Sequence, residues 1–266
     1  MDKTSLGDRM KTNYESVSQT RLTRRTPVII RLDGKAFHTF TKGMKRPFDE
    51  NLIQCMTTTT RNLVENIEGC EFGYTQSDEI SLLLTDYKKF KTQAWFDYKV
   101  QKIVSVAASM CTAYFNRIFF KNYGFGKPAF FDARVFSIPK EEVVNYFIWR
   151  QQDATRNSIQ MVGQSVFSHK ELHGKSCDEI QEMLWSQKGI NWNDIDTEKK
   201  MGSCVYKRYF VSEMKQTSIN VVDNKAVSVG YDYDGTIRTE YYIDKEPPIF
   251  TKDRDYIQKF VDVDKE

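Results

Sequence analysis

Two short acidic stretches near the N-terminus carry residue types suited to metal-dependent phosphoryl transfer. In VIIRLDGKAFHTF an apolar run leads into Asp33 and Gly34, and in QSDE the carboxylates are Asp78 and Glu79. Taken alone, an Asp-Gly dipeptide is most often a turn, and the QSDE carboxylates would be hairpin or exposed strand charges. The two stretches form a candidate site only if the fold brings them together.

Carboxylates that meet at one sheet edge need a cation between them, because they repel each other and lose hydration. Mg²⁺ suits such oxygen ligands and completes its shell with water and substrate phosphates. Two ions would serve nucleotidyl transfer, one lowering the pKa of an attacking oxygen and the other neutralising a leaving pyrophosphate. Adjacent strand residues point to opposite faces, so Asp78 ranks first as a ligand and Glu79 second. Gly34 would let a triphosphate approach the backbone closely.

Hydrophobic periodicity and turn residues predict the elements that position these side chains. Asp49 is suited to cap a helix whose apolar face continues to Ile67, and Gly69 is suited to end it. We expect this helix, a second helix at about 96–120, and strands at 27–32, 70–76, 79–85 and 131–138.

The order strand, helix, two strands, helix, strand is that of the ferredoxin-like βαββαβ motif, an α+β fold. In that topology the third strand lies beside the first and antiparallel to it, which makes Asp33 a neighbour of Asp78. We expect residues 1–139 to form this catalytic domain with a basic N-terminal arm, and residues 140–266 to form a helical and β extension packed on it. The extension would hold helices at about 141–152 and 176–189, then β-hairpins with Asp-Asn and Asp-Gly turns.

The composition is that of a protein with a substantial core, since 40% of the 266 residues are apolar and 14% aromatic. No run approaches about 18 continuous apolar residues, and the N-terminus lacks the apolar centre of a secretory signal, so we expect a cytoplasmic protein without membrane contact. The five cysteines never occur as CxxC, which indicates reduced thiols. A net charge of +3 leaves a nucleic-acid partner open.

Other polar residues have ordinary explanations beside functional ones. Lys99 and Lys102, one turn apart on the second helix, could clamp phosphates, but such lysines are more often solvated surface residues. His38 could contact phosphate or transfer a proton, although a lone histidine between two phenylalanines is more often structural. His169 and His173 have the spacing of a metal pair, but no third ligand follows and we expect no zinc site.

The stretches RLDGKAFHTF and YTQSDEIS together resemble the tRNA-His guanylyltransferase family, whose members extend nucleic acid in the 3′-to-5′ direction. Further matches are KVQK, FDARV, WRQQD and KMGSCV, so the resemblance covers most of residues 27–211. It implies a catalytic domain similar to the palm of ordinary polymerases, with two or more Mg²⁺ ions.

The resemblance also implies roles for individual residues. Asp33 and Asp78 would hold the metals, with the Gly34 carbonyl assisting and Glu79 in a supporting catalytic role. It further implies a homotetramer with tRNA spanning subunits. The implied nucleotide-binding positions are Gly34, Lys35, Ala36, Phe37, His38, Arg46, Ser77, Lys99 and Lys102.

One departure from the family pattern bears on the substrate. Guanylyltransferases proper carry a HINNLYN-type segment after WRQxD, whereas this chain has TRNSIQM, residues 155–161, without the histidine linked to anticodon recognition. Arg156 is a candidate to take over part of that role. The chain therefore resembles the bacterial and archaeal like-protein branch of the family.

That branch is implied to repair 5′-truncated tRNA by template-dependent 3′-to-5′ addition. ATP or GTP would first activate the 5′ end, and the 3′-hydroxyl of an incoming NTP would then attack it. Alternatives are a true tRNA-His guanylyltransferase that adds one guanylate, a palm-like nucleotide cyclase using the same carboxylates, and a non-catalytic RNA-binding module.

Overall fold

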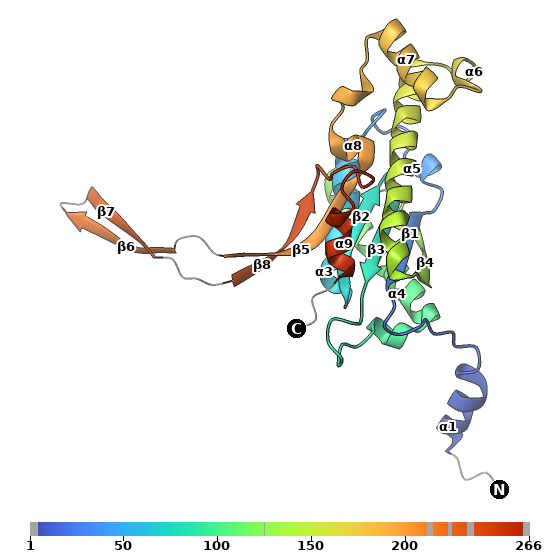
Figure 1. Cartoon of the computed structure of the whole chain (residues 1–266), viewed down its shortest axis with the longest axis vertical. Helices are drawn as coiled ribbons and strands as arrows, with labels where there is room; N and C mark the ends of the chain where they lie inside the picture. The colour runs from blue at the N-terminus through green and yellow to red at the C-terminus, as the bar shows by residue number, and fades with distance from the viewer. Residues whose placement is uncertain (1–4, 125, 212–214, 223–224, 233–236, 263–266) are drawn as a thin grey trace.

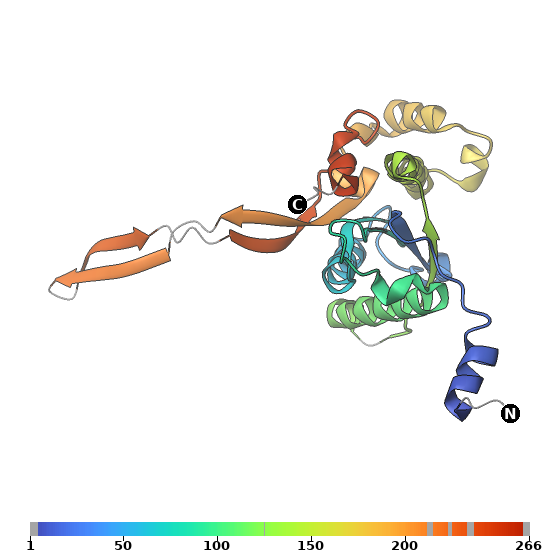
Figure 2. The same ribbon diagram turned by 60° about the horizontal axis from the view of Figure 1, so that its bottom comes forward.

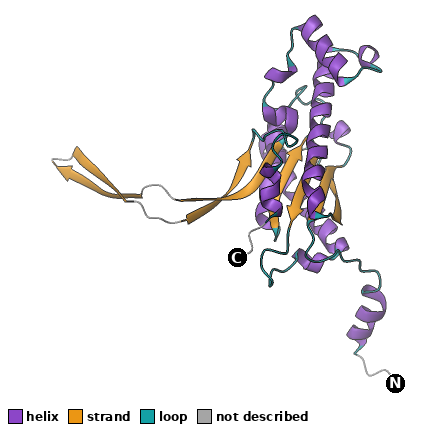
Figure 3. Cartoon of the chain, viewed as in Figure 1, coloured by secondary structure: helices purple, strands orange, loops and turns teal. Residues whose placement is uncertain are grey.

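The centre of the molecule is a six-stranded antiparallel sheet. A computed structural model describes residues 5–124, 126–211, 215–222, 225–232 and 237–262. The strands of the sheet are β1 (Val28–Gly34), β2 (Cys70–Gln76), β3 (Glu79–Leu84), β4 (Phe131–Ser137), β5 (Ser203–Val211) and β8 (Ile237–Asp244). Their spatial order is β4-β1-β3-β2-β5-β8, and every neighbouring pair is antiparallel. Helices cover both faces, and β5 and β8 leave the sheet as a two-stranded arm (Figure 1, Figure 3). The predicted α+β class is confirmed.

The first four strands and two helices follow the predicted order. α3 (Glu50–Asn66) connects β1 to β2, and α4 (Val100–Tyr123) connects β3 to β4. β3 lies between β1 and β2, as the split motif requires, and its register pairs Asp33 with Glu79. The sequence pattern therefore correctly predicted that β3 lies beside β1.

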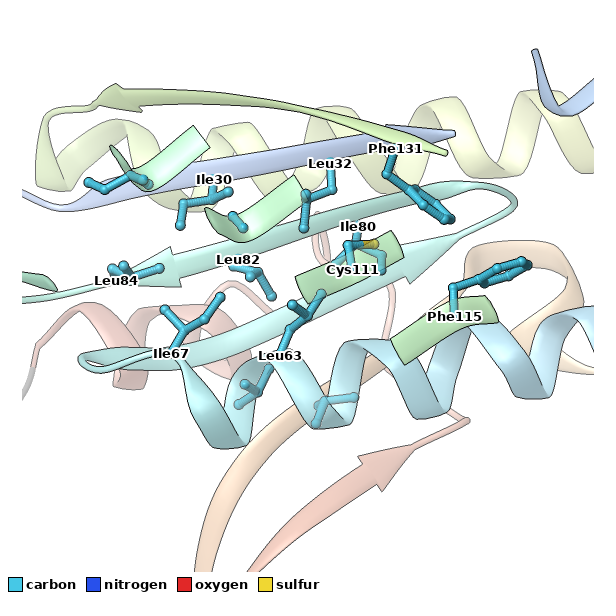
Figure 4. Packing of buried hydrophobic residues seen from close by; sticks show 14 of the residues in the cluster. Ile30, Leu32, Leu63, Ile67, Ile80, Leu82, Leu84, Cys111, Phe115 and Phe131 are labelled. Carbon is cyan, nitrogen blue, oxygen red and sulfur yellow. The ribbon is translucent and has the colours of Figure 1, made fainter. Parts of the chain in front are cut away.

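Alternating residues of the strands build two cores. Ile30 and Leu32 join Ile80, Leu82 and other apolar residues in the core beneath α3 and α4 (Figure 4). Residues of opposite parity, such as Ile29 and Leu83, belong to a second core with α5 (Lys140–Val166) and α9 (Asp255–Val261). Figure 2 shows α4 in green on one side of the sheet and α5 in yellow-green on the other. Both faces of the central strands are therefore buried.

The first of these helices is held by specific caps and internal hydrogen bonds. The Asp49 carboxylate accepts from the N–H groups of Asn51 and Leu52, which confirms the predicted cap. Gly69, three residues beyond the last residue of the helix, has φ +75°, a conformation that favours glycine. The threonines that lower helix propensity are tolerated because three of them, Thr57, Thr59 and Thr60, donate to the carbonyl four residues earlier.

The other predicted helices differ in length from the structure. α5 extends to Val166 instead of ending near Gln152, because Ile159 and Val162 pack in a third core with α7 (Cys177–Lys188). α4 begins only at Val100, because the preceding turn η2 (Trp95–Tyr98) contains residues with positive φ. Among the described residues, α4 alone has the length and apolar composition of a membrane span, and here its inner face packs in the core.

The remaining elements are short or peripheral. β6 and β7 form a two-stranded sheet of their own. The predicted Asp-Asn and Asp-Gly turns, at residues 223–224 and 234–235, lie outside the described residues. Whether residues 1–139 form a separate domain stays a prediction, although β5 and β8 continue the same sheet. The elements not yet given are α1 (Leu6–Met10), η1 (Lys11–Glu15), α2 (Phe37–Phe40), α6 (His169–Leu172), η3 (Trp192–Asp194), α8 (Thr197–Met201), β6 (Lys215–Val222) and β7 (Lys225–Asp232).

We expect Gly73→Ala to destabilise the packing of α3 on β2. A Cβ at Gly73 would lie 2.6 Å from Val64 Cγ2 and 3.0 Å from Thr60 Cγ2. Overpacking of this kind costs about 1–3 kcal/mol of unfolding free energy, which denaturant titration would measure. Gly126→Ala is the matched control, because a Cβ there meets nothing within 4 Å. Equal stability of the two variants would contradict this account of the core.

Candidate active site

The structure brings Asp33 and Asp78 to the same end of the sheet. Asp33 is the penultimate residue of β1, and Asp78 lies in the two-residue turn that joins β2 to β3. The N–H of Gly34 donates to the carbonyl oxygen of Asp78, with an N···O distance of 3.1 Å. One backbone hydrogen bond therefore ties together two segments that are distant in the sequence.

Asp78 has an unusual electrostatic setting. Burial, with a smaller contribution from the nearby charge of Asp33, raises the pKa of its carboxyl from 3.8 to about 6, against the opposing effect of the hydrogen bond that Ser77 Oγ donates to Oδ1 at 3.1 Å. A carboxyl that resists ionisation in the protein alone is stabilised as the anion by a divalent cation. The charge pattern of this sheet end therefore fits Mg²⁺ between the two aspartates.

Few protein ligands are available at this position. In the part of the chain that the structure describes, no group of three or more His, Cys, Asp or Glu side chains is arranged to hold a metal ion. Mg²⁺ commonly binds with one or two carboxylates plus water and phosphate oxygens. Asp33, Asp78 and the Gly34 carbonyl would thus hold an Mg²⁺ ion shared with a nucleotide, and they do not resemble a closed structural metal site.

Packing requires a glycine at position 34, independently of any ligand that binds there. A Cβ at this position would lie 2.2 Å from Cδ2 of Phe37, whose ring is buried against Phe40, Phe115 and Phe131. The aromatic cluster thus closes directly beneath the backbone that carries Asp33. It fixes the path of the chain as it leaves β1.

The segment after Gly34 turns sharply into α2. Ala36 has φ +54° and precedes the first residue of this short helix, Phe37. The N–H of Lys35 donates to the Phe130 carbonyl at 2.8 Å, so the N–H groups of Gly34 and Lys35 are both already used. Contacts from this backbone to a phosphate would come from Ala36, Phe37 and His38, since the first N–H groups of a helix lack intrahelical partners.

Glu79 is held by two arginines on the α5 face of the sheet. Arg150 Nη1 donates to both carboxylate oxygens of Glu79, at 2.9 and 2.8 Å, and Arg31 Nη2 donates to Oε2 at 2.6 Å. Arg150 is almost fully buried and also pairs with Asp153 at 3.4 Å. These contacts indicate that Glu79 anchors β3 to β1 and α5, while Asp78 occupies the turn.

A cavity of about 290 Å³ opens beside this end of the sheet. Its wall includes three of the predicted nucleotide-binding residues, His38, Arg46 and Ser77. None of the residues that line it comes from β1 or β4, so it lies on the β2 side of the carboxylates. The lining residues outside the 38–53 segment, which runs from α2 to the start of α3, and outside Gln76 and Ser77 are Ala154, Asn157, Ser158, Met161, Gln164, Ser165, Glu198, Lys199, Lys200 and Gly202.

The TRNSIQM segment belongs to the wall of this cavity. Residues 155–161 lie within α5, and Asn157, Ser158 and Met161 face the space that His38 and Arg46 also border. Ser158 is fixed there, because its Oγ accepts from Trp192 Nε1 at 3.1 Å. The part of the sequence that departs from the family pattern thus contributes to the cavity beside the carboxylates.

Lys99 and Lys102 do not lie at this site within one chain. The backbone of Lys99 forms an isolated antiparallel bridge with that of Arg21, and the N–H of Leu22 donates to the Tyr98 carbonyl oxygen. The start of α4 therefore lies near the segment that leads into β1. At about 3.3 Å per residue, β1 places this end some 17 Å from Asp33. Lys99, expected on the helix with Lys102, is instead the extended N-cap residue of α4, and only Lys102 lies within the helix. Their spacing could not indicate which end of the sheet the helix begins at.

Sequence reasoning missed the partners of Glu79. Arg31 precedes Asp33 by two residues and therefore lies on the same face of the strand. This alternation alone could have indicated that Arg31 is a neighbour of the site. Arg150 lies in the WRQQD motif, but nothing local to that motif indicates a partner on β3.

Comparisons with known proteins identify the family of this chain. The family model described as tRNAHis guanylyltransferase matches residues 7–139. The probable tRNA(His) guanylyltransferase of Homo sapiens is 30% identical over 183 residues, covering 63% of this chain and 60% of that protein.

Two solved structures are also similar. A bacterial tRNA(His) guanylyltransferase (Thg1)-like protein in complex with ATP is 42% identical with a TM-score of 0.84, covering 98% of this chain and 100% of that one. The tRNA(His) guanylyltransferase of Saccharomyces cerevisiae is 25% identical with a TM-score of 0.63, covering 74% and 93%. Enzymes of this family typically use Mg²⁺. The chain belongs to the tRNAHis guanylyltransferase (Thg1) family and is a 3′-to-5′ nucleotidyltransferase.

Proposed function

We propose that this enzyme adds nucleotides to the 5′ end of truncated tRNA, using the opposite strand as a template. The observation that carries the proposal is the placement of Asp33 and Asp78 beside a cavity whose wall contains the altered 155–161 segment. A bacterial Thg1-like protein resembles this chain along almost its whole length, and the sequence resemblance to the like-protein branch implies repair.

The nucleotide would bind with its triphosphate toward Asp33 and Asp78 and its nucleoside in the cavity. The volume of about 290 Å³ lies close to the lower limit of roughly 300 Å³ for small-molecule pockets. His38, Arg46 and Ser77 line the cavity, and Ser77 directly precedes Asp78, so these residues would contact the phosphates. Two similar solved structures of a bacterial Thg1-like protein are complexes with ATP and with GTP, which supports both nucleotides as ligands here.

The reaction would proceed in two transfers at one site. An oxygen of the RNA 5′-monophosphate attacks the α-phosphorus of ATP, and pyrophosphate leaves. The 3′-hydroxyl of an incoming NTP then attacks the RNA 5′-phosphorus, and AMP leaves. When bound, Mg²⁺ supplies charge neutralisation on the phosphates, while Asp33 and Asp78 hold and orient it. Later additions release pyrophosphate from the new 5′-triphosphate.

Lys99 and Lys102 lie at the remote end of the sheet, so another copy of the chain would have to supply them to the nucleotide site. The homotetramer that the resemblance predicts would let Lys99 and Lys102 of one copy approach the nucleotide of another. Such an arrangement would reconcile their implied role with their position near Arg21.

The template dependence is tested with a 5′-truncated tRNA, Mg²⁺ and all four NTPs. We expect each added nucleotide to pair with the opposing base and to change when that base is changed. The measurement is the sequence of the extended product, with a full-length tRNA as control. Addition of guanylate to tRNA-His alone, whatever the opposing base, would establish the guanylyltransferase alternative instead.

Asp33→Ala and Asp78→Ala should each lower nucleotide transfer by about a thousandfold or more. Several kcal/mol of charge stabilisation would be lost with the metal, and each 1.36 kcal/mol is a factor of ten in rate. Single-turnover extension of labelled RNA measures the effect, and circular dichroism checks the fold. Asp178→Ala, at an exposed position on α7, is the control that should keep full activity. Full activity in either site variant would refute the metal assignment.

The affinity for Mg²⁺ should fall as the pH is lowered through about 6. The carboxyl of Asp78, with its pKa raised to about 6, holds a proton between pH 4 and 6 that an ordinary aspartate has lost, and the metal must displace that proton. We expect about a tenfold loss of affinity per pH unit below 6, measured by calorimetry with Mg²⁺ alone. Asp33→Asn should lower the pKa of Asp78 by removing the adjacent charge. Equal affinities at pH 5 and pH 7 would contradict this setting.

A further inference from the structure

α5 leaves part of its side of the sheet uncovered, next to Asp33. On the edge strand β4, Asp132 pairs in register with Asp33, and Arg134 pairs with Arg31. Partners across antiparallel strands share a face, so these side chains project on the side of Asp33. Asp132 and Arg134 are both more than half exposed, and the ion pair between them is long at 3.7 Å. This uncovered strip is continuous with the metal-binding end of the sheet.

Trp149 of α5 borders the strip with an exposed aromatic ring. The Arg150 guanidinium lies 3.6 Å from the centroid of the Trp149 ring, and the Arg31 guanidinium lies 5.8 Å from it. Tyr146 meets the ring edge-on at 5.8 Å. Trp149 nevertheless stays 50% exposed, so these neighbours fix the ring in place and leave a large part of it open to solvent.

Exposed arginines, each beside an aspartate, lie on both sides of Trp149. Arg156 follows Trp149 by seven residues and so occupies the same face of α5; its side chain is 58% exposed and pairs with Asp153. Arg134 lies across the strip and is 57% exposed. Phe130, just before β4, is a second exposed ring, at 54%. Aromatic rings interleaved with arginines are the composition of a surface that binds single-stranded nucleic acid.

We propose that Trp149 is a stacking platform for an unpaired base of the RNA substrate, in the 3′ strand that faces the truncated 5′ end. This inference rests on the proposed function. Only unpaired bases offer a free face for stacking, and a truncated tRNA exposes such bases opposite the missing nucleotides. The nucleoside cavity lies on the β2 side of the carboxylates and Trp149 on the β1 side, so the template and the nucleotide would approach Asp33 from different directions.

Arg134 and Arg156 would contact the phosphates of the same strand. Stacking does not depend on base identity, because every base has an aromatic face. A template position needs this property, since the opposing base differs from one tRNA to another. Trp149 would thus hold the template strand, while base pairing alone would select the nucleotide.

A structural role is the competing explanation, because Trp149 also covers the ion pairs of Arg31 and Arg150 with Glu79. The two explanations differ in what RNA does to the ring. A purely structural tryptophan stays exposed when RNA binds, whereas a platform becomes covered and its fluorescence changes.

Variants of the exposed tryptophans test the proposal. With 5′-truncated tRNA, Trp149→Ala should raise the dissociation constant about tenfold, the range expected for loss of one base stack. Trp149→Phe should stay within about threefold of wild type because it keeps a ring. Trp185→Ala is the matched control on α7, where Trp185 is 61% exposed, and it should bind RNA as wild type does. Binding of ATP with Mg²⁺ should be unchanged in all three.

Fluorescence supplies a readout that does not depend on the stability of the alanine variant. The other two tryptophans, Trp95 and Trp192, are buried, so in Trp185→Phe the exposed signal comes from Trp149. Truncated tRNA should quench that signal at saturation. Unchanged fluorescence, or wild-type affinity in Trp149→Ala, would overturn the platform while leaving templated extension intact. Failure of the wild-type protein to bind or extend truncated tRNA would overturn the proposed function and this inference together.

Discussion

The carboxylate of Glu79 links three elements on which the candidate site depends. It belongs to β3, and its partners Arg31 and Arg150 belong to β1 and α5. Removing one partner of such a buried pair typically costs about 3–5 kcal/mol, because the remaining charge is left without compensation. Since Asp78 directly precedes Glu79 and Asp33 follows Arg31 by two residues, this cluster also fixes the relative positions of the two aspartates. These contacts make Glu79 a positioning residue for the two aspartates, and its catalytic role stays a prediction.

The two aspartates themselves oppose stability in the absence of a cation. Burial and mutual repulsion raise the pKa of Asp78, so the protein alone resists the charged state that metal binding requires. The surrounding structure offsets this cost through the hydrogen bond from Gly34 to Asp78 and the aromatic cluster beneath Gly34. A site built in this way gains most of its favourable electrostatics only when Mg²⁺ and a nucleotide are bound together.

Local patterns predicted much of the fold, because strand alternation, a cap at Asp49 and a stop at Gly69 are encoded within a few residues of where they act. The neighbourhood of Asp33 and Asp78 could also be predicted, since it follows from the order of the elements. The full length of α5 could not, because residues 155–166 are polar enough to end a helix and are stabilised by packing on α7. The partners of Arg150 and the remote position of Lys99 depend on long-range geometry in the same way.

α5 connects the two surfaces that a templated enzyme needs. Its middle carries Trp149 and Arg150 over the sheet, and its last turns carry Asn157 and Met161 beyond the sheet into the cavity wall. At about 1.5 Å per residue, Trp149 and Met161 are separated by some 18 Å along one rigid helix. A helix that ended near Gln152 would leave the cavity without this wall. α5 continues past the WRQQD motif. It therefore connects the ion cluster around Glu79 to residues 155–161, where this chain departs from the family pattern.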